Sequence, residues 1–197
     1  MQQRHSVRLL ALMMILATGG CAAGNTYDYR NALAGIPLTG TTAINVEVID
    51  QRPYILDGEK EPTFVGLQRG GYGNPFNVNT TSGEPLAVDM ESALESILQT
   101  RGFQIVQADD EAKQRTLRIV LTEWKSDVML RMRVIYNVIA RVLDASGELL
   151  AEHSIQGEEV MGGGMQSANS ANAARTFEAK MSELLRHEAI AKAINNP

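Results

Sequence analysis

The sequence is poor in the residues that build disulfide, metal or nucleic-acid sites. A single cysteine occurs in 197 residues, which excludes a disulfide within the chain and a multi-cysteine zinc site. Aromatic residues make up only 5% of the chain, so the core must rest on aliphatic side chains and methionine. The net charge is −5 and no basic run stands out, which argues against a nucleic-acid partner.

The three histidines do not stand at spacings typical of catalysis. His5 lies near the N-terminus, His153 in an expected strand and His187 in an expected helix, and no Ser, Cys or Asp partners the last two at a motif spacing. The acidic run at 109–111 lacks the ligand spacing of a calcium loop. We therefore predict no enzyme activity, no cofactor and no metal, and we interpret His153 as a surface residue.

Residues 1–20 have the three parts of an export signal. Arg4 and Arg8 precede an apolar run over 9–17, and small residues then lead into Cys21. The apolar run is shorter than the roughly 20 residues that span a bilayer. The segment resembles a bacterial lipobox, although Thr18 stands where that pattern prefers leucine. The alternative interpretation is an ordinary secretory signal with an incidental cysteine.

The resemblance to a lipobox implies cleavage before Cys21 and a lipid, diacylglycerol with further acyl chains, on that cysteine. Two or more chains give stable anchoring, because each buried methylene contributes about 0.8 kcal/mol. Loss of Arg4 and Arg8 leaves 16 basic against 23 acidic residues, a net charge of −7, so charge alone should not hold the protein on anionic lipid. Ala22, where aspartate would signal retention, implies sorting to the periplasmic face of the outer membrane.

The mature chain is expected to begin with a lipidated tether, residues 21–40, followed by a single periplasmic domain, residues 41–197. Alternating apolar residues predict a strand over 41–50. Residues 51–84 are rich in glycine and proline and predict a long loop, interrupted by a short strand around Thr63–Leu67.

The segment 85–101 gives the clearest helical pattern. Leu86, Met90, Leu94 and neighbouring apolar residues repeat with the spacing of one helical face. Gly102 suits the left-handed position that ends a helix, and Phe103 can supply the hydrophobic contact that accompanies it. A short strand over 103–106 should follow.

The second half of the chain predicts strands over 116–124, 129–143 and 148–155, with a hairpin turn at 144–147, a glycine- and methionine-rich loop at 157–166 and a helix over 167–194. The predicted fold class is α+β: a mostly antiparallel sheet with two main helices packed on one face. The strand over 129–143 has one wholly apolar face, which we interpret as core. The alternative is that Met129–Ile155 forms a hairpin that inserts into a membrane.

The loop over 68–76 is the candidate interaction site. Arg69, Tyr72 and Phe76 stand among glycines that let a partner approach the backbone closely. Arginine and tyrosine are enriched at binding hot spots. Together with 157–166, this loop is a candidate contact surface for another protein, and the competing interpretation is a plain surface loop.

Several segments together resemble the YajG family of bacterial lipoproteins. They are the lipobox-like start, the run VEVIDQRP at 46–53, the loop LQRGG at 67–71 and the helix end at Arg101–Phe103. The family is largely uncharacterised, so the resemblance implies localisation rather than activity. We expect a non-enzymatic, lipid-anchored envelope protein that binds another envelope component. The alternative is an oligomeric secretion or transport accessory, or a pore-forming lipoprotein; the sequence does not indicate the oligomeric state.

The lipid on Cys21 is directly testable. Cells grown with radioactive palmitate should label the wild-type protein, and Cys21→Ser should abolish the label because no thiol remains to accept a diacylglycerol. Equal labelling of the two proteins would refute lipidation at this residue.

Overall fold

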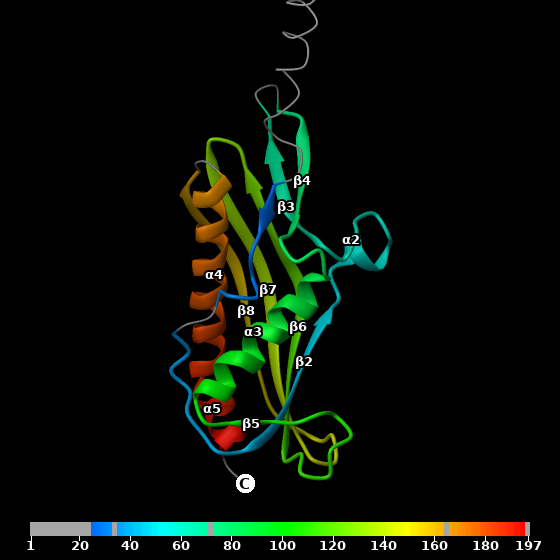
Figure 1. Ribbon diagram of the computed structural model, residues 1–197, viewed down its shortest axis with the longest axis vertical. Helices are drawn as coiled ribbons and strands as arrows, with labels where there is room; N and C mark the ends of the chain where they lie inside the picture. The colour runs from blue at the N-terminus through cyan, green and yellow to red at the C-terminus, as the bar shows by residue number, and fades with distance from the viewer. Residues whose placement is uncertain (1–24, 33–34, 71–72, 164–165, 196–197) are drawn as a thin grey trace, which may run out of the picture.

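The computed structural model describes residues 25–32, 35–70, 73–163 and 166–195. Within them the chain is α+β, with one eight-stranded sheet and helices beside it (Figure 1). The elements are β1 (Thr26–Tyr27), β2 (Ala43–Asp50), α2 (Pro53–Leu56), β3 (Phe64–Arg69), β4 (Pro75–Thr80), α3 (Leu86–Thr100), β5 (Gln104–Ile105), β6 (Arg115–Val128), β7 (Arg131–Asp144), β8 (Leu149–Gly162), α4 (Gln166–Arg186) and α5 (Glu188–Asn195).

The sheet is mixed, which corrects the expectation of a mostly antiparallel one. The pairs β1–β4, β2–β5, β2–β6 and β3–β6 are parallel, whereas β3–β4, β6–β7 and β7–β8 are antiparallel. A parallel pair needs a long crossover connection, and the segment containing α3 supplies it between β2 and β6. Side-chain alternation within a strand does not reveal the direction of its neighbour, so the sequence pattern could not show this.

Strand β6 is the central strand on which the others assemble. One of its edges pairs with β7 over nearly its full length. The other edge is divided between two strands: β2 pairs with it as far as Leu121, and β3 pairs with it from Ser126 onward. The residues between these two points have no strand neighbour on that edge.

Arg52 fills this break between β2 and β3. Its guanidinium is completely buried and donates hydrogen bonds to the backbone oxygens of Trp124 at 3.1 Å and Phe64 at 2.6 Å. Two further bonds, of 2.8 and 2.6 Å, reach the carboxylate of Asp50. The hydroxyl of Tyr54 also donates to the Trp124 oxygen, at 3.3 Å. One side chain thus joins the end of β2, the start of β3 and the middle of β6.

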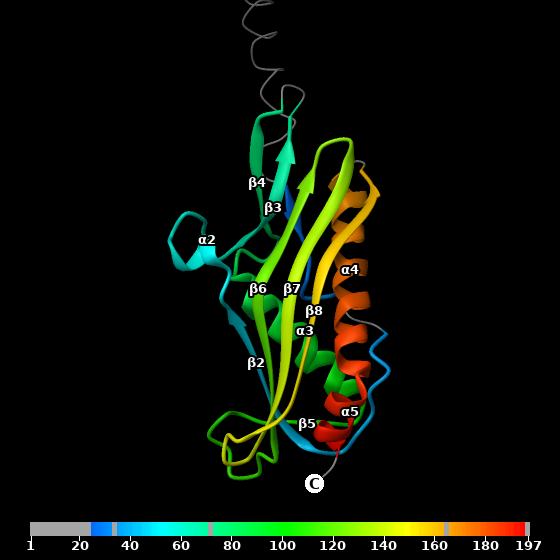
Figure 2. The ribbon, with the colours of Figure 1, turned by 180° about the vertical axis from the view of Figure 1, so that it is seen from behind.

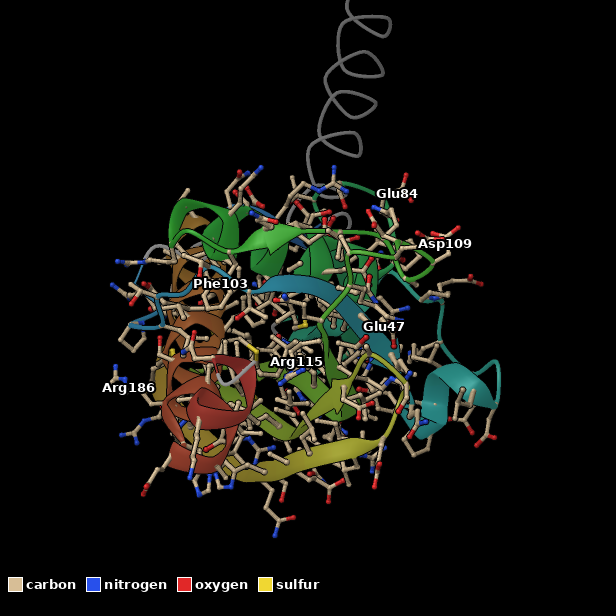
Figure 3. The ribbon with its side chains drawn as sticks, turned by 90° about the horizontal axis from the view of Figure 1, so that it is seen from below. Glu47, Glu84, Phe103, Asp109, Arg115 and Arg186 are labelled. Atoms are coloured by element: carbon tan, nitrogen blue, oxygen red, sulfur yellow. The ribbon has the colours of Figure 1, made fainter. Side chains whose placement is uncertain are left out.

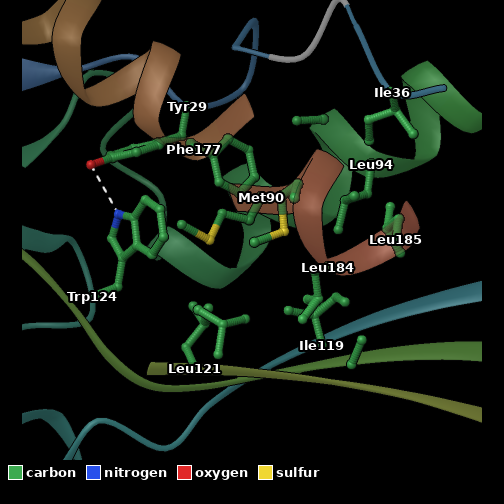
Figure 4. Packing of buried hydrophobic residues seen from close by; sticks show 14 of the residues in the cluster. Tyr29, Ile36, Met90, Leu94, Ile119, Leu121, Trp124, Phe177, Leu184 and Leu185 are labelled. Carbon is green, nitrogen blue, oxygen red and sulfur yellow. Dashed lines mark hydrogen bonds between the residues drawn. The ribbon is translucent and has the colours of Figure 1, made fainter. Parts of the chain in front are cut away.

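A bulge in β6 turns Trp124 into the core. The register with β7 shifts between Leu121 and Glu123, so one extra residue is inserted at this point. Regular alternation along the strand would place Trp124 and Leu121 on opposite faces, and the bulge instead places both side chains in the same core cluster. There the Trp124 indole donates a 3.1 Å hydrogen bond to the Tyr29 hydroxyl and meets the Phe177 ring edge to face (Figure 4).

Helices α3, α4 and α5 lie on the same side of the sheet in Figures 1 and 2, and the hydrophobic core fills the space between them and the strands. The apolar stripe of α3 is buried as predicted, with Met90 and Leu94 completely covered. The predicted helix end is also confirmed. Gly102 has φ +98°, and the amide of the buried Phe103 bonds to the Leu98 oxygen.

Residues 25–32 and 35–40 contribute to the core, whereas we expected a tether there. Tyr27, Tyr29, Ile36 and Leu38 are all buried. In Figure 1 this segment runs along the helical side of the molecule before it turns into β2. The apolar residues of this segment show no periodicity, because most of it is an extended strap that crosses other elements. Its Gly, Asn and Pro residues are typical of a loop, so the sequence does not indicate that these apolar residues are buried.

The expected loop over 157–166 is also corrected, because β8 continues to Gly162. Every residue of β7 from Arg131 to Leu143 has a β8 partner, and this pairing extends β8 beyond its apolar part. The C-terminal helix, expected to be continuous, is divided at His187 into α4 and α5. Likewise, the expected loop over 51–84 contains α2, β3 and β4.

The apolar face of β7 belongs to the core, as we interpreted it from the sequence. Met132, Val134, Val138 and Val142 are at most 1% exposed. Membrane insertion of Met129–Ile155 would have to expose this face, so the fold does not favour it. No helix in the described part of the chain is long and apolar enough to cross a bilayer.

The buried Arg52 should contribute far more to stability than an exposed arginine in the same sheet. Arg52→Met removes the buried guanidinium that donates to Asp50 and to two backbone oxygens, and should cost about 3–5 kcal/mol in the free energy of unfolding. The matched control is Arg118→Met, which removes a half-exposed ion pair with Glu47 and should cost at most about 1 kcal/mol. Urea unfolding followed by Trp124 fluorescence measures both, and equal losses would contradict this role of Arg52.

Candidate functional site

The described chain starts beside the β3–β4 hairpin. The backbone oxygen of Asn25 accepts a 3.2 Å hydrogen bond from the Asn79 amide, and the Asn25 side chain donates to Gln68. Strand β1 runs parallel to β4, which starts at the hairpin tip with Pro75. The chain therefore enters the fold from the tip side of this hairpin, next to Arg69.

A glycine lets this hairpin lie close to β6. A Cβ at Gly66 would stand 2.5 Å from the Ser126 backbone oxygen, so any side chain there would force the two strands apart. The close pairing carries Arg69 to the end of β6. There its guanidinium holds Asp127 with two hydrogen bonds, of 2.9 and 2.7 Å. The hairpin tip and the β6–β7 turn consequently lie at the same end of the molecule (Figure 1).

A groove of about 560 Å³ lies at this end, and we call it the tip groove. Its polar lining comes from Arg69, Asp127, Arg131 and Arg133. Its apolar lining comes from the β6–β7 turn and from β8, through Met129, Leu130 and Val160. These three apolar side chains are exposed, and Leu130 is the most open at 86%. The groove thus combines guanidinium groups with uncovered hydrophobic side chains.

The cations in the tip groove outnumber their carboxylate partners. Hydrogen bonds from Arg69, assisted by Arg133, hold the pKa of Asp127 below its usual value, so this carboxylate stays ionised at neutral pH. Arg133 lies 3.7 Å from Asp127 and 3.6 Å from Glu158. Arg131 is exposed and forms no ion pair with a described residue. One positive charge therefore remains available to a ligand from outside the domain.

The structure describes two of the three residues of the candidate interaction loop, and they lie on different strands. Arg69 ends β3 and lines the tip groove. Phe76 lies on β4 opposite Gln68, is 37% exposed, and its ring approaches Gly70. Tyr72 lies outside the described residues, and so does Cys21.

The tip groove also contains residues that sequence patterns did not single out. Asp127, Met129, Leu130 and Arg131 surround the β6–β7 turn, whereas we expected β6 to end at 124. The only sequence feature that marks this part of the groove is the apolar pair Met129-Leu130 followed by Arg-Met-Arg at 131–133. That pattern predicts the start of a core strand at 129, whereas residues 129 and 130 form the turn before β7.

His153 and His187 form an unexpected pair. Their rings stack with centroids 3.7 Å apart, joining β8 to the break between α4 and α5. Burial lowers the pKa of His153, as does the neighbouring His187, while Glu183 opposes the shift. His153 thus lies on a strand and is half-exposed, as expected for a strand surface position, and its ring also packs against His187. Within the described ranges no three His, Cys, Asp or Glu side chains gather as a metal site.

Comparison with solved structures places the fold among known ones. A Xanthomonas campestris protein of the DUF330 family superposes with a TM-score of 0.54 at 12% identity, over 87% of this chain and 96% of its own. Looser similarities include PelC of Paraburkholderia phytofirmans, solved as a dodecamer (TM-score 0.41, 14% identity, 77% and 94% of the two chains), and lipoprotein GNA1162 of Neisseria meningitidis (0.32, 16%, 73% and 97%).

No protein-family model and no curated protein matches the chain by sequence. The superposition on the DUF330 protein therefore establishes a shared fold.

Proposed function

We propose that the protein is a lipid-anchored component of the bacterial cell envelope, cleaved before Cys21, and that its domain binds another envelope component without catalysing a reaction. The lone cysteine at the end of an export signal carries this proposal. Membership of the YajG family belongs to the same proposal. Its support is the lipobox-like start and the segments 46–53, 67–71 and 101–103.

The place where the chain enters the fold supports the proposed anchoring. Three residues separate Cys21 from Asn25, so the two Cα atoms can be at most about 14 Å apart. Asn25 is held on the β3–β4 hairpin. A lipid on Cys21 would thus keep the tip groove close to the membrane and direct the other end of the sheet into the periplasm.

This orientation changes which surface should meet a protein partner. Both contact segments that we expected, 68–76 and 157–166, belong to the anchored end. The distal end, about 40 Å away along β8, contains the adjacent exposed residues Leu149 and Leu150. The acidic run 109–111 belongs to the connection between β5 and β6, which lies at the same end in Figure 1; Figure 3, seen from that end, labels Asp109. Paired exposed apolar residues are typical of a protein contact, so we place the partner at the distal end.

A secretion or transport accessory remains the second candidate function. Strand β8 is its structural support, because it pairs only with β7 among the described strands and can accept a further strand from another chain. Assembly along β8 would use the strand edge and leave the core face of β7 buried. The oligomeric state is thus a separate question from insertion into a membrane.

Sorting to the outer membrane predicts a defined effect of residue 22. Ala22→Asp should move the protein from the outer to the inner membrane fraction, because aspartate after a lipidated cysteine resembles the retention signal of Gram-negative lipoproteins. Ala22→Ser is the matched control and should leave the distribution unchanged. Density-gradient fractionation measures both, and an outer-membrane position of both variants would contradict this sorting.

The distal contact predicts a position-dependent cross-link. A photo-reactive amino acid replacing Leu150 should give a discrete adduct with an envelope protein in intact cells. The same residue replacing Val88 on α3, which is similarly exposed at 42% against 45% for Leu150, should give none. Identical adduct patterns from the two positions, or no adduct from Leu150, would count against a distal binding surface.

A further inference from the structure

The tip groove has the chemistry of a surface that touches lipid headgroups. Met129 and Leu130 occupy the turn between β6 and β7, at 59% and 86% exposure. Arg69, Arg131 and Arg133 lie around them. Apolar side chains at the tip of a turn can enter the interfacial region of a bilayer, while arginine side chains bind phosphate oxygens with two parallel hydrogen bonds.

The point of chain entry places this surface next to the bilayer. Asn25 donates to Gln68, the residue before Arg69, and a lipid on Cys21 could lie no more than about 14 Å from it. Such a short connection cannot turn the domain over to present its distal end. The apolar and cationic side chains of the groove are therefore within reach of the headgroups whenever the anchor is inserted.

The distribution of charge supports the same orientation. The mature chain is acidic overall, yet the tip groove has an excess of guanidinium groups. The acidic run 109–111, in the connection between β5 and β6, lies at the distal end (Figure 1). Near an anionic surface, each basic residue contributes about 1 kcal/mol, and the attraction fades within a Debye length. The distal carboxylates are too far from the bilayer to oppose it.

We infer that the tip groove is a membrane-docking surface, in which Met129 and Leu130 enter the interface and Arg131, beside Arg133, binds the phosphates of anionic phospholipids. This inference rests on the proposed lipid anchoring and adds to it a fixed orientation. The acyl chains hold the protein on the membrane, and the tip groove holds the sheet upright.

Lipidated full-length protein, purified from membranes and reconstituted into vesicles, provides the test. A Cβ at Gly162 meets no atom within 4 Å, so Gly162→Cys accepts a fluorescent probe beside the groove without removing any lining side chain. Ala145→Cys, exposed at the distal turn, is the matched control. The lipid thioether protects Cys21 from the labelling reagent.

Nitroxide-labelled headgroups should quench the probe at 162 several-fold more than the probe at 145. This difference should be larger in vesicles containing phosphatidylglycerol than in vesicles where phosphatidylcholine replaces it. In the Gly162→Cys protein, Leu130→Ser or the double change Arg131→Gln with Arg133→Gln should reduce the quenching. Arg186→Gln, an exposed arginine at the end of α4, should leave it unchanged.

The outcomes separate this inference from the anchoring on which it rests. A purified chain that fails to float with vesicles contradicts both. A chain that floats but shows equal quenching at 162 and 145, or the same quenching with either lipid composition, contradicts only docking. Energy transfer between labelled copies at 162, without quenching by headgroups, would assign the groove to a second copy and overturn lipid docking.

Discussion

The break along one edge of β6 is the constraint on which the rest of the structure depends. Two strands must share that edge, and the completely buried Arg52 joins them by bonding to backbone oxygens of β3 and β6 while Asp50 balances its charge. Because β3 is fixed to the last part of β6, the β3–β4 hairpin projects beyond the sheet. The tip groove exists only through that arrangement, since its Arg69–Asp127 pair joins the two strands.

The sequence predicted local elements well where a repeating pattern coincided with burial on one side. Helix α3, its end at Gly102 and the β7–β8 hairpin are found as expected. The sequence did not predict the structure where the buried residues do not recur at a regular spacing. The strap over 25–40 packs through isolated side chains such as Tyr29 and Ile36. The last part of β8 is exposed and rich in Glu and Gly, so only pairing with β7 defines it as a strand.

The candidate site was predictable only in part, for a related reason. Arg69 was singled out by its residue type among glycines, and it does line the tip groove. Leu130 and Arg131 were missed because they lie more than 60 residues further along the chain, and only the parallel pairing of β3 with β6 brings them beside Arg69. Strand β6 continues to Val128, past the bulge at 121–123 that interrupts its alternation of side chains. The sequence pattern therefore places the turn at 129–130 within the next strand.

The proposed lipid on Cys21 would be joined to one end of an elongated sheet by a short connection, which would fix the orientation of the domain on the membrane. Neutron reflectometry of the lipidated chain on a supported bilayer measures that orientation directly. Anchoring and docking at the tip groove predict one protein layer in contact with the headgroups and about 50 Å thick, because β6 alone is about 46 Å long. A layer about half as thick, with the sheet lying flat, or a layer separated from the headgroups by water, would contradict it.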